Sequence, residues 1–228
     1  MAEKYQVQYS VDLVFCIDTT GSMDELLNTV KENALNLYQD FTQMMLKKRK
    51  VVSSVRVRVV AFRDYVADGD MAMRVTKFFH LPEEAESLRL AVSSLDADGG
   101  GDDPEDGLEA LAYAMKSDWS RAEQKRRHVI VLWTDAPTHD LGFGKSAPNY
   151  PAGMPADFEE LTRWWGCKGE PGVMDESAKR LLLFAPDAKS WSTIRDNWNN
   201  VIQFESKAGQ GLREVDYSQI LSAISNTI

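Results

Sequence analysis

Three oxygen-bearing side chains lie within five residues of one another at the end of an apolar segment. The stretch VDLVFCIDTTGSMDEL, residues 11–26, places Asp18, Thr20 and Ser22 between an apolar run and the start of a helical pattern. A carboxylate and two neutral hydroxyls are the kind of oxygen ligands that hard divalent cations such as Mg²⁺ prefer. Gly21 permits a turn tight enough for both hydroxyls to face one side. The first chemistry that these residues suggest is therefore cation binding through oxygen.

Two further aspartates occupy comparable places in the chain. Asp135 follows the apolar run Val129–Trp133, and Asp102 lies in the glycine-rich stretch DADGGGDDPEDGLEALAYAM, which opens a helix. Ligands of open α/β sheets bind beyond the carboxyl ends of the strands. If the strands are neighbours, three carboxylates converge at one crevice, where a bound cation would relieve their mutual repulsion. Each aspartate also has a structural interpretation, as a helix cap or as a turn residue at the end of a strand.

The remaining polar residues are weaker candidates. His80, His128 and His139 lie on separate segments, which argues against a zinc or copper site. Asp64, in AFRDY, could support the same crevice without contacting the cation, but a salt bridge to Arg63 or a loop turn explains it equally well. The loop and first-turn acids need no function; they are Asp98, Asp103 and Glu105.

The elements that must position these residues alternate between strands and helices. Apolar or alternating runs predict strands at Leu13–Ile17, Val55–Phe62, Met73–Phe79, Val129–Trp133, Arg180–Phe184 and Val201–Phe204. Helical spacing predicts one long helix over Met23–Phe41 and others at Glu83–Leu95, from about Pro104, and at Ala156–Trp165, Ser190–Trp198 and Ser218–Ile228. This alternation predicts an α/β fold, a doubly wound and mostly parallel central sheet with helices on both faces.

The chain length of 228 residues fits a single domain, 1–228, with an irregular insertion at about 136–172. The insertion is rich in proline and glycine and contains Trp164 and Trp165. Loops of this length are often lids or binding loops. The two tryptophans could anchor a partner, but we interpret them as pinning the insertion onto the domain.

Composition excludes several classes of partner. The chain has 26 Lys and Arg against 35 Asp and Glu, a net charge of −9, which argues against nucleic acid or an anionic membrane as the main partner. The segment MAEKYQVQYS lacks the apolar stretch of a signal peptide, and no run approaches the roughly 20 apolar residues of a membrane helix. Cys16 and Cys167 are far apart, and Cys16 lies in an apolar run. We therefore expect no disulfide and a cytoplasmic setting.

In their order along the chain, these motifs resemble the metal-ion-dependent adhesion site of von Willebrand factor type A domains. That site has the form D-x-S-x-S, a threonine in a later loop and an aspartate after a central strand; this chain has D-x-T-G-S and VLWTDAP in the same order. The resemblance covers nearly the whole chain and implies a Rossmann-like fold. It also implies a first ligand loop of Asp18, Thr20 and Ser22, a second with Asp102 and a third with Asp135. Asp18 and Asp102 would be direct ligands, and Asp135 could act through water.

One position departs from the family pattern. Asp102, in GGGDDPEDGL, stands where members usually carry threonine, and a subset of intracellular and bacterial members resembles this chain in the form GGGD-x-PE. A third carboxylate would bind the cation more tightly but weaken its attraction for an acidic side chain of a partner. Water, a hydroxyl or a carbonyl is then an alternative occupant of the open position.

The function that we expect is non-enzymatic, divalent-metal-dependent protein binding. The resemblance implies a standalone bacterial scaffold or adaptor whose protein partner meets the metal-site face, with Mg²⁺, or Mn²⁺ or Ca²⁺, as the cation. Two alternatives remain open. A metal-dependent phosphoryl-transfer or phosphatase enzyme would use Asp18, although such enzymes typically carry an acid two residues on, where this chain has Thr20. The cation could also be purely structural.

Overall fold

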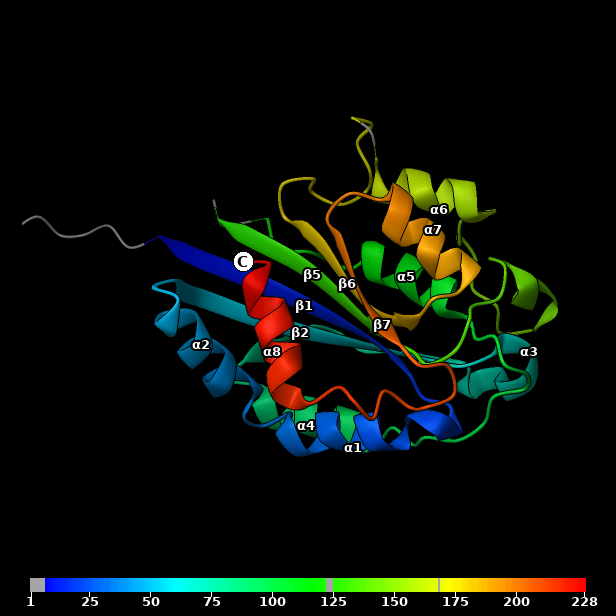
Figure 1. Cartoon of the computed structure of the whole chain (residues 1–228), viewed down its shortest axis with the longest axis horizontal. Helices are drawn as coiled ribbons and strands as arrows, with labels where there is room; N and C mark the ends of the chain where they lie inside the picture. Colours follow the sequence, from blue (N-terminus) through cyan, green and yellow to red (C-terminus); the bar gives the residue numbers. More distant parts are fainter. Residues whose placement is uncertain (1–6, 122–124, 168) are drawn as a thin grey trace, which may run out of the picture.

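Seven strands form one sheet in a computed structural model that describes residues 7–121, 125–167 and 169–228. The sheet order is β3-β2-β1-β5-β6-β7, and β4 also pairs with β2 (Figure 1). The strands are β1 (Gln8–Asp18), β2 (Val51–Phe62), β3 (Met73–Val75), β4 (Phe79–Leu81), β5 (Arg126–Trp133), β6 (Lys179–Pro186) and β7 (Val201–Ser206). Only β3 and β4 run antiparallel to their neighbour among these strands. The predicted α/β architecture is confirmed.

Helices cover both faces of this sheet. Strand β1 is therefore buried on both faces, which explains why its sequence is continuously apolar. Leu13, Phe15 and Ile17 belong to one core cluster, and Val14 and Cys16 belong to the other, because successive side chains of a strand point to opposite faces. The first cluster lies under α1 (Asp24–Asn33), α2 (Leu37–Lys47), α4 (Ala85–Ser93) and α8 (Tyr217–Asn226). The second lies under α5 (Gly107–Met115), α6 (Phe158–Trp165) and α7 (Lys189–Asn197).

The helix predicted over Met23–Phe41 is wrong in one respect, because it is two helices. A short 3₁₀ turn, η1 (Gly21–Met23), leads into α1, and the chain turns at residues 34–36 before α2 begins. Both helices pack in the same core cluster, so the apolar spacing of three and four continues across the break. Periodicity alone therefore does not reveal the interruption.

The strand predicted over Met73–Phe79 is also divided, into β3 and β4. Thr76 leaves the ladder because its Oγ1 accepts a hydrogen bond from the Val59 N–H at 2.9 Å, while its carbonyl accepts one from Arg58 Nε at 2.8 Å. The Thr76 N–H still donates to the Val59 carbonyl at 2.9 Å, so the side chain replaces one of the two backbone hydrogen bonds of this pair. The result is two three-residue strands along the outer side of β2.

The helix expected from about Pro104 begins only at Gly107. Glu105 forms a parallel bridge with Thr138, which holds this residue outside the helix. The bridge joins the glycine-rich loop to the segment that follows β5. It therefore ties together two of the segments that the sequence analysis assigned to the candidate site.

Residues 136–172 contain a second 3₁₀ turn, η3 (Phe143–Ser146), and the helix α6, and they pack on the side of the sheet that carries α5. Trp165 is fully buried; it donates to the Asn199 carbonyl at 2.9 Å and stacks on Trp198 with ring centroids 5.4 Å apart. Trp164 is only half-buried beneath Lys116, whose Nζ lies 3.7 Å from the ring centroid. The interpretation of the pair as a packing anchor is confirmed for Trp165.

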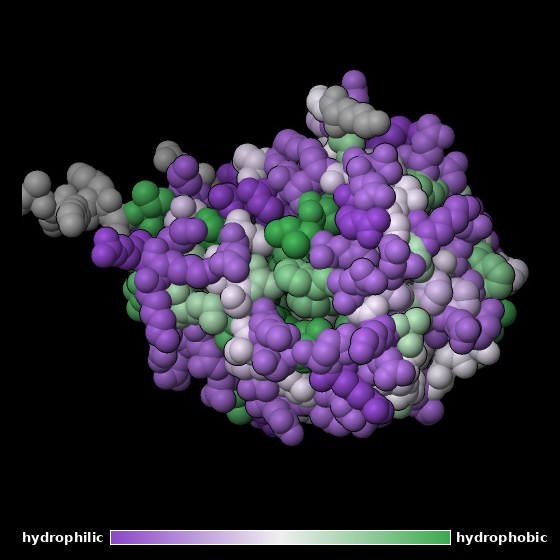
Figure 2. Space-filling model, in the orientation of Figure 1, coloured by the Kyte–Doolittle hydropathy of each residue, from purple (hydrophilic) through white to green (hydrophobic). Residues whose placement is uncertain are grey.

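The surface is mostly hydrophilic in the view of Figure 2, with hydrophobic residues gathered near its centre, between α8 and α7 of Figure 1. Strand β7, at one edge of the sheet, carries two of the exposed apolar side chains, Ile202 and Phe204. None of the helices in the described residues combines the length and the apolar character needed to cross a bilayer. Residues 1–6, on which the signal-peptide expectation partly rests, lie outside the described residues.

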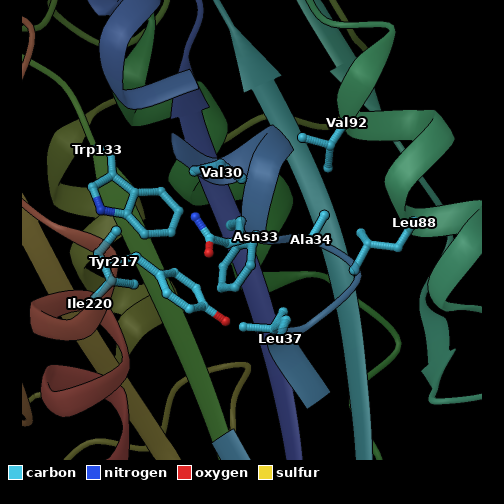
Figure 3. Close-up of a pocket in the computed structure, with 10 residues that line it drawn as sticks. Val30, Asn33, Ala34, Leu37, Leu88, Val92, Trp133, Tyr217 and Ile220 are labelled. Atoms are coloured by element: carbon cyan, nitrogen blue, oxygen red, sulfur yellow. The ribbon is translucent and has the colours of Figure 1, made fainter. Parts of the chain in front are cut away.

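A small apolar pocket lies beneath the turn between α1 and α2 (Figure 3). It has a volume of about 20 Å³ and is lined from α1, α2, α4, α8 and the sheet, by residues that include Val30, Leu88, Trp133 and Ile220. A space of this size holds about one water molecule. It is a gap in the packing, and the chemistry of the protein must be sought elsewhere.

Candidate metal centre at the carboxyl edge of the sheet

The segments that follow β1 and β5 meet because these two parallel strands are neighbours and end at the same edge of the sheet. A cleft of about 640 Å³ opens there, between the turn after β1, the glycine-rich loop before α5, the segment after β5 and residues 208–209. Four of the five predicted ligands line it; they are Thr20, Ser22, Asp102 and Asp135. The topology thus brings together groups that are more than 100 residues apart in sequence.

Asp18, the fifth predicted ligand, lies beneath the cleft and is fully buried. Its Oδ1 accepts hydrogen bonds from the Thr20 N–H at 2.9 Å and the Thr20 hydroxyl at 2.6 Å. Its Oδ2 accepts one from the Thr134 hydroxyl at 2.7 Å, a contact that the sequence analysis missed. The pKa of Asp18 is raised to about 6, mainly by burial and to a smaller extent by the negative charge of Asp135, while these hydrogen bonds act in the opposite direction.

Asp135 joins three segments of the chain at the cleft. Its Oδ1 accepts a hydrogen bond from the Ser22 hydroxyl at 2.9 Å, and its Oδ2 accepts one from the Gly211 N–H at 2.7 Å. The Asp135 carbonyl also accepts from the Gly209 N–H at 2.9 Å. The loop between β7 and α8 therefore forms part of the site, although no residue type or spacing in this loop indicates such a role.

Replacing Gly211 by alanine is expected to destabilise the protein by at least about 2 kcal/mol more than replacing Gly209. Both glycines have positive φ, +63° and +67°, so both substitutions carry the same backbone cost. A Cβ at Gly211 would lie 2.1 Å from the Ser22 carbonyl oxygen, whereas a Cβ at Gly209 would meet nothing within 4 Å. Urea unfolding of the two variants measures the difference. Equal losses would show that the loop moves away from Ser22 without cost.

Asp102 lies at the rim of the cleft, and its side chain is 58% exposed. Its Oδ1 lies 3.2 Å from Nε2 of His139. This contact is with the segment after β5 rather than with Asp18 or Asp135. The structure therefore places the second predicted ligand loop at the cleft but directs the Asp102 carboxylate to a histidine.

Glu105, which the sequence analysis treated as a first-turn acid, is the carboxylate of this loop that is buried at the site. It is 3% exposed, and its Oε2 has no hydrogen-bond partner among the described residues. A Cβ on Gly100 would lie 3.0 Å from Glu105 Oε1 and 3.2 Å from Thr20 Cγ2, so the glutamate lies close to the turn after β1. No local signal in the sequence marks this glutamate, because its place before α5 depends on the bridge to Thr138.

Negative charge at this edge exceeds the positive charge that the described residues supply. The pKa of Glu105 is raised to about 9, first by burial and then by the negative charges of Asp18, Asp64, Asp68 and Asp106. The nearby Arg63 donates to the Thr19 and Asp96 carbonyls and pairs with Asp68 at 3.9 Å. Its guanidinium is thus committed elsewhere. Buried acids with an unpartnered oxygen and two hydroxyls at one cleft suit a divalent cation.

Comparison with known families and proteins gives a consistent assignment. Residues 13–137 match the family described as von Willebrand factor type A domain. The chain is also 28% identical over 145 residues to "Alpha-protein kinase vwkA" of Dictyostelium discoideum. That match covers 64% of this chain and 21% of the kinase, so the chain spans about a fifth of the length of the curated relative.

Solved structures share the fold at low sequence identity. A von Willebrand factor type A protein from Catenulispora acidiphila superposes with a TM-score of 0.53 and 16% identity, covering 95% of this chain and 42% of that one. The pilus adhesin SpaC of Lactobacillus rhamnosus GG has a TM-score of 0.50 and 12% identity, covering 98% of this chain and 31% of the adhesin. These similarities concern the fold alone.

Proposed function

Since the chain belongs to the von Willebrand factor type A domain family, we propose that it is a divalent-metal-dependent protein-binding module rather than an enzyme. The observation that carries this proposal is the convergence of Thr20, Ser22 and Asp135 on one cleft, above the buried Asp18. Protein binding is also consistent with the fold shared with a pilus adhesin. The partner, in this proposal, meets the face of the molecule on which the cleft opens.

The cation would be held by oxygens that face the cleft, those of Thr20, Ser22, Glu105 and Asp135. Asp18 would support it from beneath, since it is fully buried below the cleft lining, where its two oxygens accept hydrogen bonds from Thr20 and Thr134. Oxygen donors favour Mg²⁺, with Mn²⁺ or Ca²⁺ as alternatives. When bound, the cation supplies a positive centre for an oxygen of the partner, from a carboxylate, a hydroxyl or a carbonyl.

Two features of the geometry support binding over phosphoryl transfer. An aspartate that forms a phosphoaspartate needs a free carboxylate oxygen, but Asp18 is fully buried and hydrogen-bonded through both oxygens. Thr20 stands where such enzymes typically carry an acid, and its hydroxyl donates to Asp18. Turnover of generic phosphate esters with Mg²⁺, lost in Asp18→Asn, would overturn this part of the proposal.

The proposed setting is a scaffold or adaptor role in the cytoplasm. Cys16 and Cys167 are both free, as a reducing compartment would keep them. The net charge of −9 favours a protein partner over nucleic acid or an anionic membrane. The scaffold or adaptor role itself rests on membership of the von Willebrand factor type A family.

Metal-dependent recognition is tested with peptides selected from a displayed random library on the full chain in Mg²⁺. Selected peptides are expected to lose at least tenfold in affinity when EDTA replaces Mg²⁺, and equally on Asp18→Asn. Peptides that bind elsewhere, and so bind equally with EDTA, serve as the control. If every selected peptide ignores both EDTA and the substitution while EDTA lowers the melting temperature, the cation is structural and the proposal fails.

A further inference from the structure

A second group of potential metal ligands lies behind the glycine-rich loop, outside the set predicted from the sequence. Asp64, Asp106 and His139 are all buried, and one ligand atom from each lies within 4.8 Å of the others. We refer to these three residues as the inner cluster. They come from three separate segments, after β2, before α5 and after β5, so no local motif reveals them.

The imidazole of the inner cluster is held between two carboxylates. His139 Nδ1 lies 3.1 Å from Oδ1 of Asp106, and Nε2 lies 3.2 Å from Oδ1 of Asp102. The ring also stacks on Phe143, with centroids 4.0 Å apart. Metal-binding histidines commonly use one ring nitrogen for the metal and donate the other N–H to a carboxylate. In this arrangement Nδ1 faces the buried Asp106, and the exposed Asp102 is placed to orient the ring.

The carboxylates of the inner cluster are fixed by backbone amides. Asp106 Oδ2 accepts a hydrogen bond from the Tyr65 N–H at 2.6 Å, and Asp64 Oδ1 accepts one from the Val66 N–H at 2.6 Å. The salt bridge to Arg63 considered for Asp64 is absent from the contacts of the described residues, where Arg63 pairs with Asp68. Each carboxylate keeps its second oxygen for another contact.

An orphaned oxygen at the border of this group shows that the group lies in a region short of positive charge. Glu105 precedes Asp106, is nine-tenths buried or more, and leaves Oε2 without a hydrogen-bond partner among the described residues. Its carboxylate interacts unfavourably with Asp64 and Asp106 as well as with Asp18. Glu105 therefore lies between the cleft and the inner cluster, and a cation in either place would offset its charge.

We propose that Asp64, Asp106 and His139 form a second cation site, distinct from the cleft, that takes a first-row transition ion such as Zn²⁺, Mn²⁺ or Co²⁺. An imidazole nitrogen with two carboxylates suits these ions, whereas Mg²⁺ prefers oxygen ligands alone. Metal–ligand bonds near 2.1 Å separate ligand atoms by roughly 3–3.5 Å. The present spacing of up to 4.8 Å thus requires only small side-chain movements.

The test is the number of Co²⁺ equivalents bound by the metal-free full chain, measured by calorimetry and by visible absorption. Wild type is expected to bind two equivalents. His139→Gln is expected to weaken one of them at least tenfold, and Asp18→Asn is expected to weaken the other. His80→Gln, which removes an exposed histidine on β4, is the matched control and is expected to keep both. Asp102→Asn is expected to weaken the His139-dependent equivalent about tenfold.

The outcomes separate this site from the cleft. Two equivalents in His139→Gln with unchanged affinities, or a single equivalent in wild type that disappears in Asp18→Asn, would overturn the second site and leave the cleft proposal intact. If His139→Gln does not fold, ¹⁵N-histidine NMR of wild type replaces it. Zn²⁺ is then expected to shift one imidazole resonance in wild type and in Asp18→Asn, and an unmoved set of resonances would equally overturn the proposal.

Discussion

Replacing Asp18 by asparagine is expected to weaken Mg²⁺ binding at least 100-fold while the protein remains folded. Asp18 is the most deeply buried acid of the cleft site, and its charge acts on the cation through a low-dielectric environment that screens it poorly. It also orients Thr20 and Thr134 through hydrogen bonds at 2.6 and 2.7 Å. Calorimetric titration with Mg²⁺, an ion that the inner cluster is not expected to take, measures the change.

The matched control is Asp24→Asn, which removes one negative charge from the exposed first turn of α1. This variant is expected to bind Mg²⁺ within about twofold of wild type, because an exposed charge is screened by water and salt. Equal Mg²⁺ affinities for wild type, Asp18→Asn and Asp24→Asn would refute the cleft as a cation site.

The Asp18→Asn substitution is also expected to change the pH dependence of stability in the absence of metal. Because the pKa of Asp18 is raised to about 6, the folded protein holds a proton there that the unfolded chain has released above its ordinary pKa near 4. Stability from this group is therefore present at low pH and is lost as pH rises through 6. With EDTA, the unfolding free energy of Asp18→Asn relative to wild type is expected to rise between pH 5 and 8, by about 1.4 kcal/mol.

Replacing Trp165 by alanine is expected to cost about 3–5 kcal/mol of unfolding free energy. The indole is fully buried, donates to the Asn199 carbonyl and stacks on Trp198. Alanine would leave a cavity between the insertion and the end of α7, and the Asn199 carbonyl would lose its partner. Urea unfolding, followed by far-ultraviolet circular dichroism, measures the loss.

Its neighbour provides the comparison. Trp164→Ala is expected to cost less than about 1.5 kcal/mol, because this ring is only half-buried at the margin of the core cluster and lies under the exposed end of Lys116. Similar costs for the two variants would mean that the insertion, residues 136–172, is held by both rings equally. The interpretation of Trp165 as the anchor would then fail.

Most strands and the arrangement of helices on both faces of the sheet could be predicted because the relevant signals are local, whereas the order of the strands in the sheet comes from the structure. A continuous apolar run such as Leu13–Ile17 identifies a strand buried on both faces, and alternation with helices identifies a parallel sheet. The breaks at residues 34–36 and at Thr76 could not be predicted in this way. In the first, the apolar period is unchanged across the turn; in the second, a threonine hydroxyl replaces a ladder hydrogen bond.

The candidate site was predictable where a motif places the group directly after a strand. Asp18, Thr20, Ser22 and Asp135 satisfy that condition, and the structure gathers them at one edge. Glu105 was misjudged because its orientation depends on a bridge to Thr138, a contact across 33 residues.

His139 escaped attention for a related reason. Its carboxylate neighbours, Asp102 and Asp106, come from the loop before α5, and Asp64 comes from the segment after β2. A histidine that is isolated along the chain can still complete a cluster when three loops fold over one another. The spacing of histidines in a sequence therefore excludes only local metal motifs.

The two edges of the sheet differ in how readily a strand of another chain could pair with them. At one edge, the three-residue strands β3 and β4 cover β2. At the other edge, β7 has no further strand beside it in the described part of the chain and exposes Ile202 and Phe204. Short strands are poor templates for pairing, and long open ones are good templates. If two molecules associated by pairing their β7 strands, both open edges would be covered in the first step. Association by strand pairing would therefore stop at a dimer and could not continue into a fibre.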